Sequence, residues 1–209
     1  KMKTSNIILL AVFISILVWI LAAFLTAKAK IKEVIEEHPE LVKNSEEEIK
    51  RKVVDLEAFH TLIINGNGDL YIERSEGYSF DQRIDDVNTV EVTNDTLFIS
   101  VSGKDCVLNV NKIKNINTND EVYVELNNLK ADTINIFTSD ESELEVNSLQ
   151  AKFFKLVTED KSEVELNEVN YPDIEAEFFI RNYSSVQIDK TKGMGLTVKK
   201  DPDAEYEDD

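Results

Sequence analysis

Two columns of carboxylates recur at a fixed spacing in the second half of this 209-residue chain. The aspartates are Asp120, Asp140 and Asp160, and the glutamates are Glu125, Glu145 and Glu165. If successive repeats stack as strands, neighbouring carboxylates in a column lie about 4.8 Å apart. Like charges at that spacing raise one another's pKa, and a hard cation such as calcium would relieve the repulsion with oxygen ligands. The alternative, which we favour, is a solvated acidic face with interspersed lysines such as Lys161, so no metal-binding residue is predicted.

The sequence offers little for catalysis. His38 and His60 have no cysteine or second histidine at ligand spacing, which argues against a zinc site. No Ser/His/Asp motif is present, and Gly66-Asn67-Gly68 lacks the third glycine and the following helix of a phosphate-binding loop. Some longer β-solenoid enzymes cleave acidic polysaccharides with outer-face carboxylates, but this surface is too negative to attract a polyanion. We predict a protein that is not an enzyme, with no catalytic residue and no cofactor.

A twenty-residue repeat must position these columns. The segments 109–128, 129–148 and 149–168 align without a gap, and a fourth copy follows after a two-residue insertion. The apolar columns of the three gap-free copies are Ile116, Ile136 and Leu156; Val124, Leu144 and Val164; and Leu126, Val146 and Leu166. A fixed period near twenty with internal alternation is typical of a solenoid of strands, in which each unit buries its apolar face only against its neighbours.

Each unit contains two short alternating runs separated by a polar break, as in Ile134–Ile136 and Leu144–Val146. Alternation places the apolar residues of both runs on one face, and the T-x-D break makes the corner between them. An asparagine ends the second run, where its short amide can hydrogen-bond backbone at a turn; these residues are Asn127, Asn147 and Asn167. We therefore predict a mainly β fold, a short parallel β-helix or β-solenoid with rungs of about twenty residues.

The N-terminus carries a second strong signal. Thr4–Ala27 has no charge, and Ile7–Leu25 is almost wholly apolar, which exceeds the roughly 18 residues of a membrane-spanning helix candidate. A signal peptide is the rival interpretation, because Ala27-Lys28-Ala29 resembles a cleavage site, but its apolar core is shorter. We expect an uncleaved transmembrane anchor over residues 1–28. Lysines flank both sides almost equally, so charge does not set the orientation.

Three further segments follow the anchor. Residues 29–55 are highly charged with a sparse apolar stripe broken near Pro39, which predicts a helical stalk, either a solvated spacer or a docking surface for another membrane protein. Residues 56–200 form the predicted β domain. Residues 201–209 are expected to be an acidic, disordered tail.

Turn signals organise the first half of the β domain. Asn65–Asp69 separates two strand-like runs and predicts a glycine-rich hairpin turn. Asn94-Asp95 separates Thr89–Val92 from Leu97–Val101 and predicts a second hairpin. Cys106, the single cysteine, excludes an intrachain disulfide and is expected to be a small buried hydrophobe in a strand, Cys106–Val110.

These same segments carry a family resemblance. Leu56–Phe59, Ile63–Gly68, Leu70–Glu73 and the pattern from Val90 to Ile99, followed by the strand repeats, resemble the GIN-domain family. Its members are described as head domains of auto-transporter adhesins in Gram-negative bacteria. The resemblance covers roughly residues 56–200 and implies an extracytoplasmic location, and the family has no established catalytic residues to transfer. Polar corners replace the family's glycine-rich ones here, and a spanning helix replaces the usual export signal.

The net charge and the order of the predicted segments together limit the classes of function that fit this chain. A net charge of −18 argues against nucleic-acid binding and against a basic, lipid-binding face on the folded part. We expect a single-pass protein of the inner membrane whose C-terminal domain is periplasmic and acts as a scaffold or accessory subunit of an envelope complex, with other envelope or membrane proteins as partners. The alternatives are an adhesin-like domain that binds a surface ligand and a calcium-binding β-roll.

Overall fold

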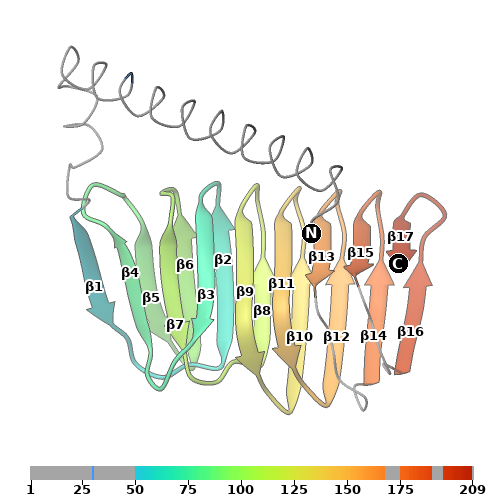
Figure 1. Cartoon of the computed structure of the whole chain (residues 1–209), viewed down its shortest axis with the longest axis horizontal. Coiled ribbons are helices and arrows are strands. Elements are labelled where there is room, and N and C mark those ends of the chain that lie inside the picture. The colour runs from blue at the N-terminus through green and yellow to red at the C-terminus, as the bar shows by residue number, and fades with distance from the viewer. Residues whose placement is uncertain (1–29, 31–49, 168–174, 190–194, 209) are drawn as a thin grey trace, which may run out of the picture. The chain divides into compact units, whose positions relative to one another are not determined.

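The computed structural model describes Lys30 and residues 50–167, 175–189 and 195–208 (Figure 1). The chain divides into two units, residues 1–49 and 50–209. The predicted anchor, residues 1–28, lies outside the described residues, as do residues 29 and 31–49 of the predicted stalk. Among the residues that are described, no helix has the length and apolar character needed to cross a membrane.

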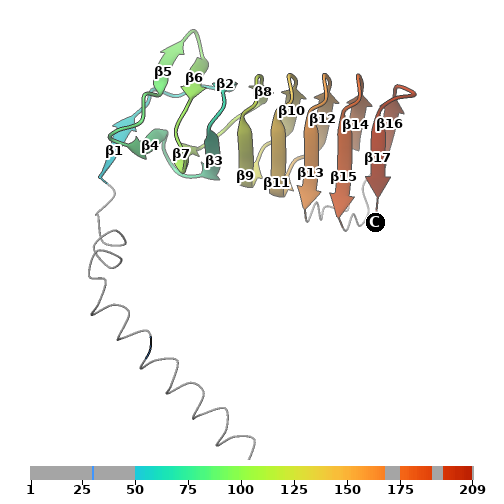
Figure 2. The same cartoon turned by 90° about the horizontal axis from the view of Figure 1, so that it is seen from above.

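The described part of the second unit is built from two sheets, which Figure 2 shows as two layers. Sheet A has nine strands in the spatial order β1 (Arg51–Asp55), β4 (Ser79–Arg83), β7 (Cys106–Val110), β3 (Asp69–Arg74), β9 (Tyr123–Lys130), β11 (Glu143–Gln150), β13 (Glu163–Asn167), β15 (Ser185–Asp189) and β17 (Glu205–Asp208). Sheet B has eight strands in the order β16 (Gly195–Lys200), β14 (Glu175–Ile180), β12 (Phe153–Thr158), β10 (Thr133–Thr138), β8 (Asn115–Thr118), β2 (Thr61–Gly66), β6 (Thr96–Val101) and β5 (Thr89–Thr93).

Each repeat contributes one strand to sheet B and the next strand to sheet A, and equivalent strands pair in parallel. Ile136 lies between Ile116 and Leu156, and Leu144 lies between Val124 and Val164. The predicted twenty-residue register and the mainly β fold are therefore confirmed. Because the strands form two separate sheets, we describe the arrangement as a two-sheet ladder rather than as a closed β-helix.

The core lies between the two sheets, because alternation along each strand turns every second residue inward. In the second repeat the strand Thr133–Thr138 alternates exposed or half-buried positions with buried ones. The inner columns predicted from the sequence are at most 3 % exposed, and they include Ile116, Ile136, Leu156, Val124, Leu144, Val164, Leu126, Val146 and Leu166. Stacking like on like gives each column a continuous apolar wall, which no single repeat could bury alone.

The first half of the ladder differs from the predicted hairpins in one place. β2 and β3, on either side of Asn65–Asp69, belong to different sheets, so the predicted hairpin is wrong and this segment is a corner. At this corner the backbone of Gly66 lies close to the backbone of Val101 in the adjacent rung. A Cβ on Gly66 would lie 2.0 Å from the Val101 carbonyl oxygen, so only glycine allows the two rungs to stack here. The second hairpin is confirmed, since β5 and β6 pair antiparallel around Asn94 and Asp95.

The chain also departs from a simple succession of rungs. The rung formed by β2 and β3 has a neighbour on each side: the rung of β6 and β7, and the rung of β8 and β9. The spatial order of these three rungs therefore differs from their order along the chain. Antiparallel strands then close this end of the ladder. β4 pairs with β7 and β1 pairs with β4 on sheet A, and β5 pairs with β6 on sheet B.

Two boundaries expected from the sequence are wrong. Residues Arg51–Asp55, part of the predicted stalk, form β1, which pairs antiparallel with β4 along its whole length. The expected disordered tail contains a strand, β17, which pairs in parallel with β15. Ala204 and Tyr206 occupy the inner positions of Ser184 and Val186, so this segment is another copy of the repeat despite its acidic composition.

Candidate functional site

The aspartate column lies at the corners where the chain passes from sheet B to sheet A. Asp120, Asp140 and Asp160 all adopt the left-handed conformation, with φ of 64°, 59° and 58°. Asn182 is at the same corner of the next repeat and has φ of 49°. Asp and Asn tolerate this conformation better than other non-glycine residues. The presence of an uncharged member indicates that the column is set by backbone geometry rather than by charge.

The carboxylates of this column are engaged with neighbouring corners. Asp120 Oδ2 accepts a hydrogen bond from the Gly66 amide at 3.0 Å, and Asp160 Oδ1 accepts one from Asn182 Nδ2 at 2.9 Å. Asp140 Oδ2 accepts a hydrogen bond from the Ser139 hydroxyl at 2.9 Å. Each contact stabilises a turn. In the described ranges, no group of three or more His, Cys, Asp or Glu side chains is arranged to hold a metal ion.

The outer face of sheet A carries the glutamate column. Glu125, Glu145 and Glu165 lie side by side in register on β9, β11 and β13. The Tyr123 hydroxyl donates to Glu145 Oε2 at 2.7 Å. Burial raises the pKa of Tyr123 well above its ordinary value, and the hydrogen bond to Glu145 and the nearby carboxylates raise it further. The negative column is therefore partly satisfied by a tyrosine that stays protonated.

An asparagine column runs beside the glutamates. Asn147 Nδ2 donates to Glu125 Oε1 at 3.0 Å, and Asn167 Nδ2 donates to Glu145 Oε1 and to Asn147 Oδ1, both at 3.1 Å. The prediction that these residues end the strand is wrong for Asn127 and Asn147, whereas β13 does end at Asn167. β9 and β11 continue to Lys130 and Gln150, and the amides bond side chains across rungs.

The outer face of sheet B has the opposite character, which the sequence analysis did not predict. One outward column contains, in spatial order, Phe98, Ile63, Asn117, Phe137, Val157 and Phe179. Phe98 is 44 % exposed and the others are half-buried. Five of the six residues are apolar although none belongs to the core between the sheets. The alignment contained the signal, because positions 137 and 157 are apolar on the polar side of the alternation.

Cations surround the last aromatic ring of this outward column. Lys155 Nζ and Lys199 Nζ lie 5.1 and 5.0 Å from the centroid of Phe179, and the Arg181 guanidinium carbon lies 6.0 Å from it. A cation within about 6 Å of a ring face is attracted by the ring quadrupole. Phe153, two outward positions before Val157 on β12, is 51 % exposed. One outward column of sheet B is thus apolar, with positive charge at one end, and the column beside it is polar, with Asn115, Asn135 and Lys155.

The remaining predicted residues lie apart from these faces. Cys106 is fully buried, as predicted, and burial raises the pKa of its thiol to about 11. His60 Nδ1 lies 2.8 Å from Asp95 Oδ1 at the β5–β6 turn. His38 lies outside the described residues.

Comparison with known proteins supports the fold. No protein-family model matches the sequence, and no curated protein matches it either. Among solved structures, a "putative adhesin" from Bacteroides fragilis NCTC 9343 has a TM-score of 0.53 and 11 % identity, over 78 % of this chain and 97 % of that chain. At this identity the likeness shows the fold alone. Membership of the GIN-domain family therefore stays a prediction.

Two further structures are more distant. A "putative adhesin" from Parabacteroides merdae ATCC 43184 has a TM-score of 0.42 and 13 % identity, over 76 % of this chain and 95 % of that chain. A "putative lipid binding protein" from Parabacteroides distasonis ATCC 8503 has a TM-score of 0.42 and 10 % identity, over 77 % and 97 %. Neither carries an argument about this chain.

Proposed function

We propose that this chain is a single-pass inner-membrane protein that presents a periplasmic, GIN-like β domain as a non-enzymatic interaction subunit of an envelope complex. In this proposal the β ladder is a rigid solenoid scaffold, and the outer face of sheet B is the surface on which a partner protein docks. The anchor would be the apolar run Thr4–Ala27, which is long enough to span a bilayer.

The observation that carries the proposal is the apolar column on sheet B. Folding explains apolar residues that point between the sheets, but it does not require Phe98, Phe137, Val157 or Phe179 on the outside. Contiguous exposed apolar surface on a polar protein marks interaction sites more often than isolated apolar residues do. Aromatic side chains are also enriched where partner proteins bury surface. The cations around Phe179 favour a partner whose contact surface is apolar with acidic groups at its rim.

A second candidate function is adhesin-like binding of a surface ligand. It is supported by the fold shared with the Bacteroides fragilis protein described as a putative adhesin. The anchor distinguishes the two candidates, because an adhesin has no need to stay in the inner membrane whereas a complex subunit does. Carbonate washing of membranes should leave the chain in the pellet if the first proposal holds, and its release would favour an exported protein.

The experiment that tests the docking face compares particle sizes after gentle detergent extraction of the full-length chain. We expect a complex clearly larger than the detergent-bound 23.8 kDa chain. Phe137→Asn should dissociate that complex. Asparagine already occupies the same column at Asn117, so the substitution suits the fold.

Glu163→Gln on the outer face of sheet A is the matched control and should leave the particle size unchanged. A wild-type chain that migrates alone, or a complex that survives Phe137→Asn together with Phe179→Asn, would contradict the proposal.

A further inference from the structure

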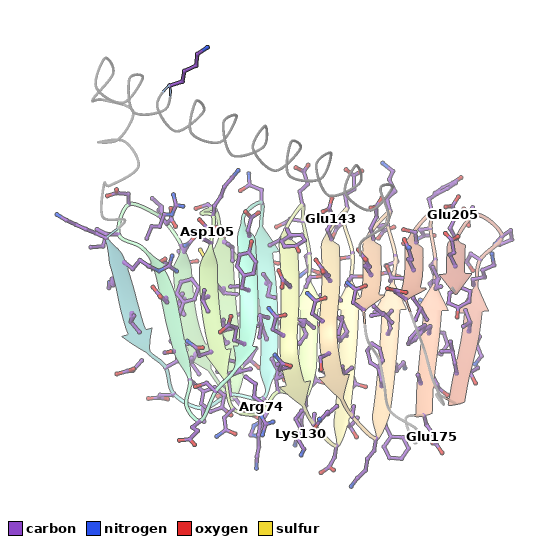
Figure 3. The ribbon with its side chains drawn as sticks, in the orientation of Figure 1. Arg74, Asp105, Lys130, Glu143, Glu175 and Glu205 are labelled. Atoms are coloured by element: carbon purple, nitrogen blue, oxygen red, sulfur yellow. The ribbon has the colours of Figure 1, made fainter. Side chains whose placement is uncertain are left out.

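A basic hollow lies at the edge of the ladder opposite the aspartate corners. The chain passes there from sheet A back to sheet B, and the hollow measures about 760 Å³. Figure 3 shows two of its residues, Arg74 and Lys130, at this edge, with Glu143 and Glu205 at the opposite one. The hollow is lined by His60, Arg74, Asn111, Lys112, Ile113, Lys114, Lys130, Ala131, Asp132 and Thr133.

The cations of the hollow come from three separate parts of the chain. Arg74 ends β3, Lys130 ends β9, and Lys112 and Lys114 lie in the connection between β7 and β8. Parallel stacking brings these segments together, since β3 pairs with both β7 and β9. The convergence of four positive charges is therefore a product of the topology and not of a local run in the sequence.

Among the described residues, these four cations form no ion pair, whereas several other cations of the chain do. Arg51 pairs with Asp81 at 2.9 Å, and Lys161 pairs with Glu141 at 2.6 Å. In the part of the chain that the structure describes, Arg74, Lys112, Lys114 and Lys130 form no ion pair.

The single carboxylate that lines the hollow, Asp132, is already held by Lys152 at 2.9 Å. That ion pair lowers the pKa of Asp132, which keeps the carboxylate charged. The chain has a net charge of −18. Four cations without ion pairs around one hollow therefore make a locally positive region on a negatively charged protein. An anion bound among them would relieve their mutual repulsion.

We propose that this hollow binds a ligand through a phosphate or a similar oxoanion that carries at least two negative charges. The planar guanidinium of Arg74 can bind such a group with two parallel hydrogen bonds, and the lysines supply compact positive charge. The buried Ile113 and half-buried Ala131 also line the hollow and add apolar surface beside the exposed cations. The volume suits a small ligand or a single headgroup.

The test is a calorimetric titration of the full-length chain, held in non-ionic detergent at low salt, with pyrophosphate as the probe. Exposed ion pairs are individually weak, so the variant removes two cations, Arg74→Gln with Lys130→Gln. We expect its dissociation constant for pyrophosphate to rise by about tenfold or more, which corresponds to about 1.4 kcal/mol. The matched control is Lys104→Gln with Lys161→Gln, which makes the same change in net charge but lies outside the hollow. Its dissociation constant should stay within about twofold of the wild-type value.

Competition identifies the source of the anion. Displacement of pyrophosphate by phosphatidylglycerol in mixed micelles, but not by phosphatidylcholine, would assign the site to a lipid headgroup. Binding of pyrophosphate without displacement by either lipid would assign it to a soluble phosphate compound. The proposal is overturned if pyrophosphate does not bind below about 1 mM, if the control variant weakens as much as the hollow variant, or if poly-glutamate binds where pyrophosphate does not. None of these readouts depends on the docking face of sheet B.

Discussion

The two outer faces of the ladder are made by the same repeat yet differ in chemistry. On sheet A the outward column of β9, β11 and β13 contains Glu125, Glu145 and Glu165. On sheet B the outward column of β10, β12 and β14 contains Phe137, Val157 and Phe179. The inner columns of both sheets are apolar, because stacking requires it. The outward columns are free of that requirement, so their difference points to what the protein contacts rather than to how it folds.

Sheet A tolerates its stacked carboxylates through local compensation. Neighbouring like charges at rung spacing cost about 1 kcal/mol or less in water. The Tyr123 hydroxyl and the amides of Asn147 and Asn167 donate hydrogen bonds to these carboxylates. Sheet B has no such requirement, because an apolar column carries no charge, but it leaves aromatic surface in water. Under the proposed function, the apolar column of sheet B is the surface that contacts a partner.

The comparison depends on both faces sharing one core, and Leu144→Asp is the strongest test of this. Leu144 is 2 % exposed and lies between Val124 and Val164 in the inner wall. An unpaired carboxylate there should cost more than about 4 kcal/mol and unfold the domain. Chemical denaturation followed by circular dichroism measures the loss. A variant that keeps the wild-type melting temperature would place Leu144 outside the core.

A smaller effect is expected from Tyr123→Phe on the acidic face. The variant loses the hydrogen bond to Glu145 and should be destabilised by about 1 kcal/mol at neutral pH. Because the pKa of Tyr123 is raised in the folded state, its contribution is fully present below the ordinary tyrosine pKa near 10 and is lost as the pH rises above it.

The wild type should therefore lose stability more steeply than Tyr123→Phe above about pH 10. Urea midpoints at a series of pH values check the slope for both proteins. Parallel pH profiles would mean that the Tyr123 hydroxyl does not bond Glu145 in solution.

The inner columns and their register could be predicted from the sequence because stacking repeats the same requirement every twenty residues. The sequence does not distinguish turns that join the two sheets from hairpin turns within one sheet. Asn94–Asp95 and Asp140–Glu141 adopt similar left-handed conformations, yet the first pair joins strands within one sheet and the second joins two sheets. Local turn chemistry is the same in both cases, and only the neighbouring rung decides the outcome.

The C-terminal strand, the apolar column and the basic hollow were harder to predict from the sequence. The tail Glu205–Asp208 resembles a disordered segment by composition, but Ala204 and Tyr206 keep the inner positions of the repeat. The apolar column on sheet B was visible at Phe137 and Val157, but alternation alone assigns such positions to solvent. The basic hollow combines cations up to 56 positions apart, from Arg74 to Lys130, and predicting it requires the spatial order of the rungs.

Calcium should have a weaker effect than either substitution above. A bound ion at a hundredfold excess over its dissociation constant would stabilise the fold by about 2.7 kcal/mol. Asp120 and Asp160 accept hydrogen bonds from neighbouring turns and Asp140 from Ser139 of its own turn, and Asn182 shares their conformation. We therefore expect millimolar calcium to change the melting temperature by less than about 2 °C, and magnesium to do the same. A large calcium-selective rise that disappears in Asp140→Asn would establish a metal site at this edge.

Among the substitutions, the smallest effect on stability should come from Phe137→Asn in the apolar column of sheet B. Phe137 is half-buried and points away from the core between the sheets, and the register already places Asn117 beside it on β8. Its loss should cost less than about 1 kcal/mol in the isolated chain, since little apolar surface is returned to water. Thermal unfolding of the variant beside Glu163→Gln checks this directly. A loss as large as that of Leu144→Asp would mean that the aromatic column supports the fold, and the contrast between the two faces would no longer distinguish binding from folding.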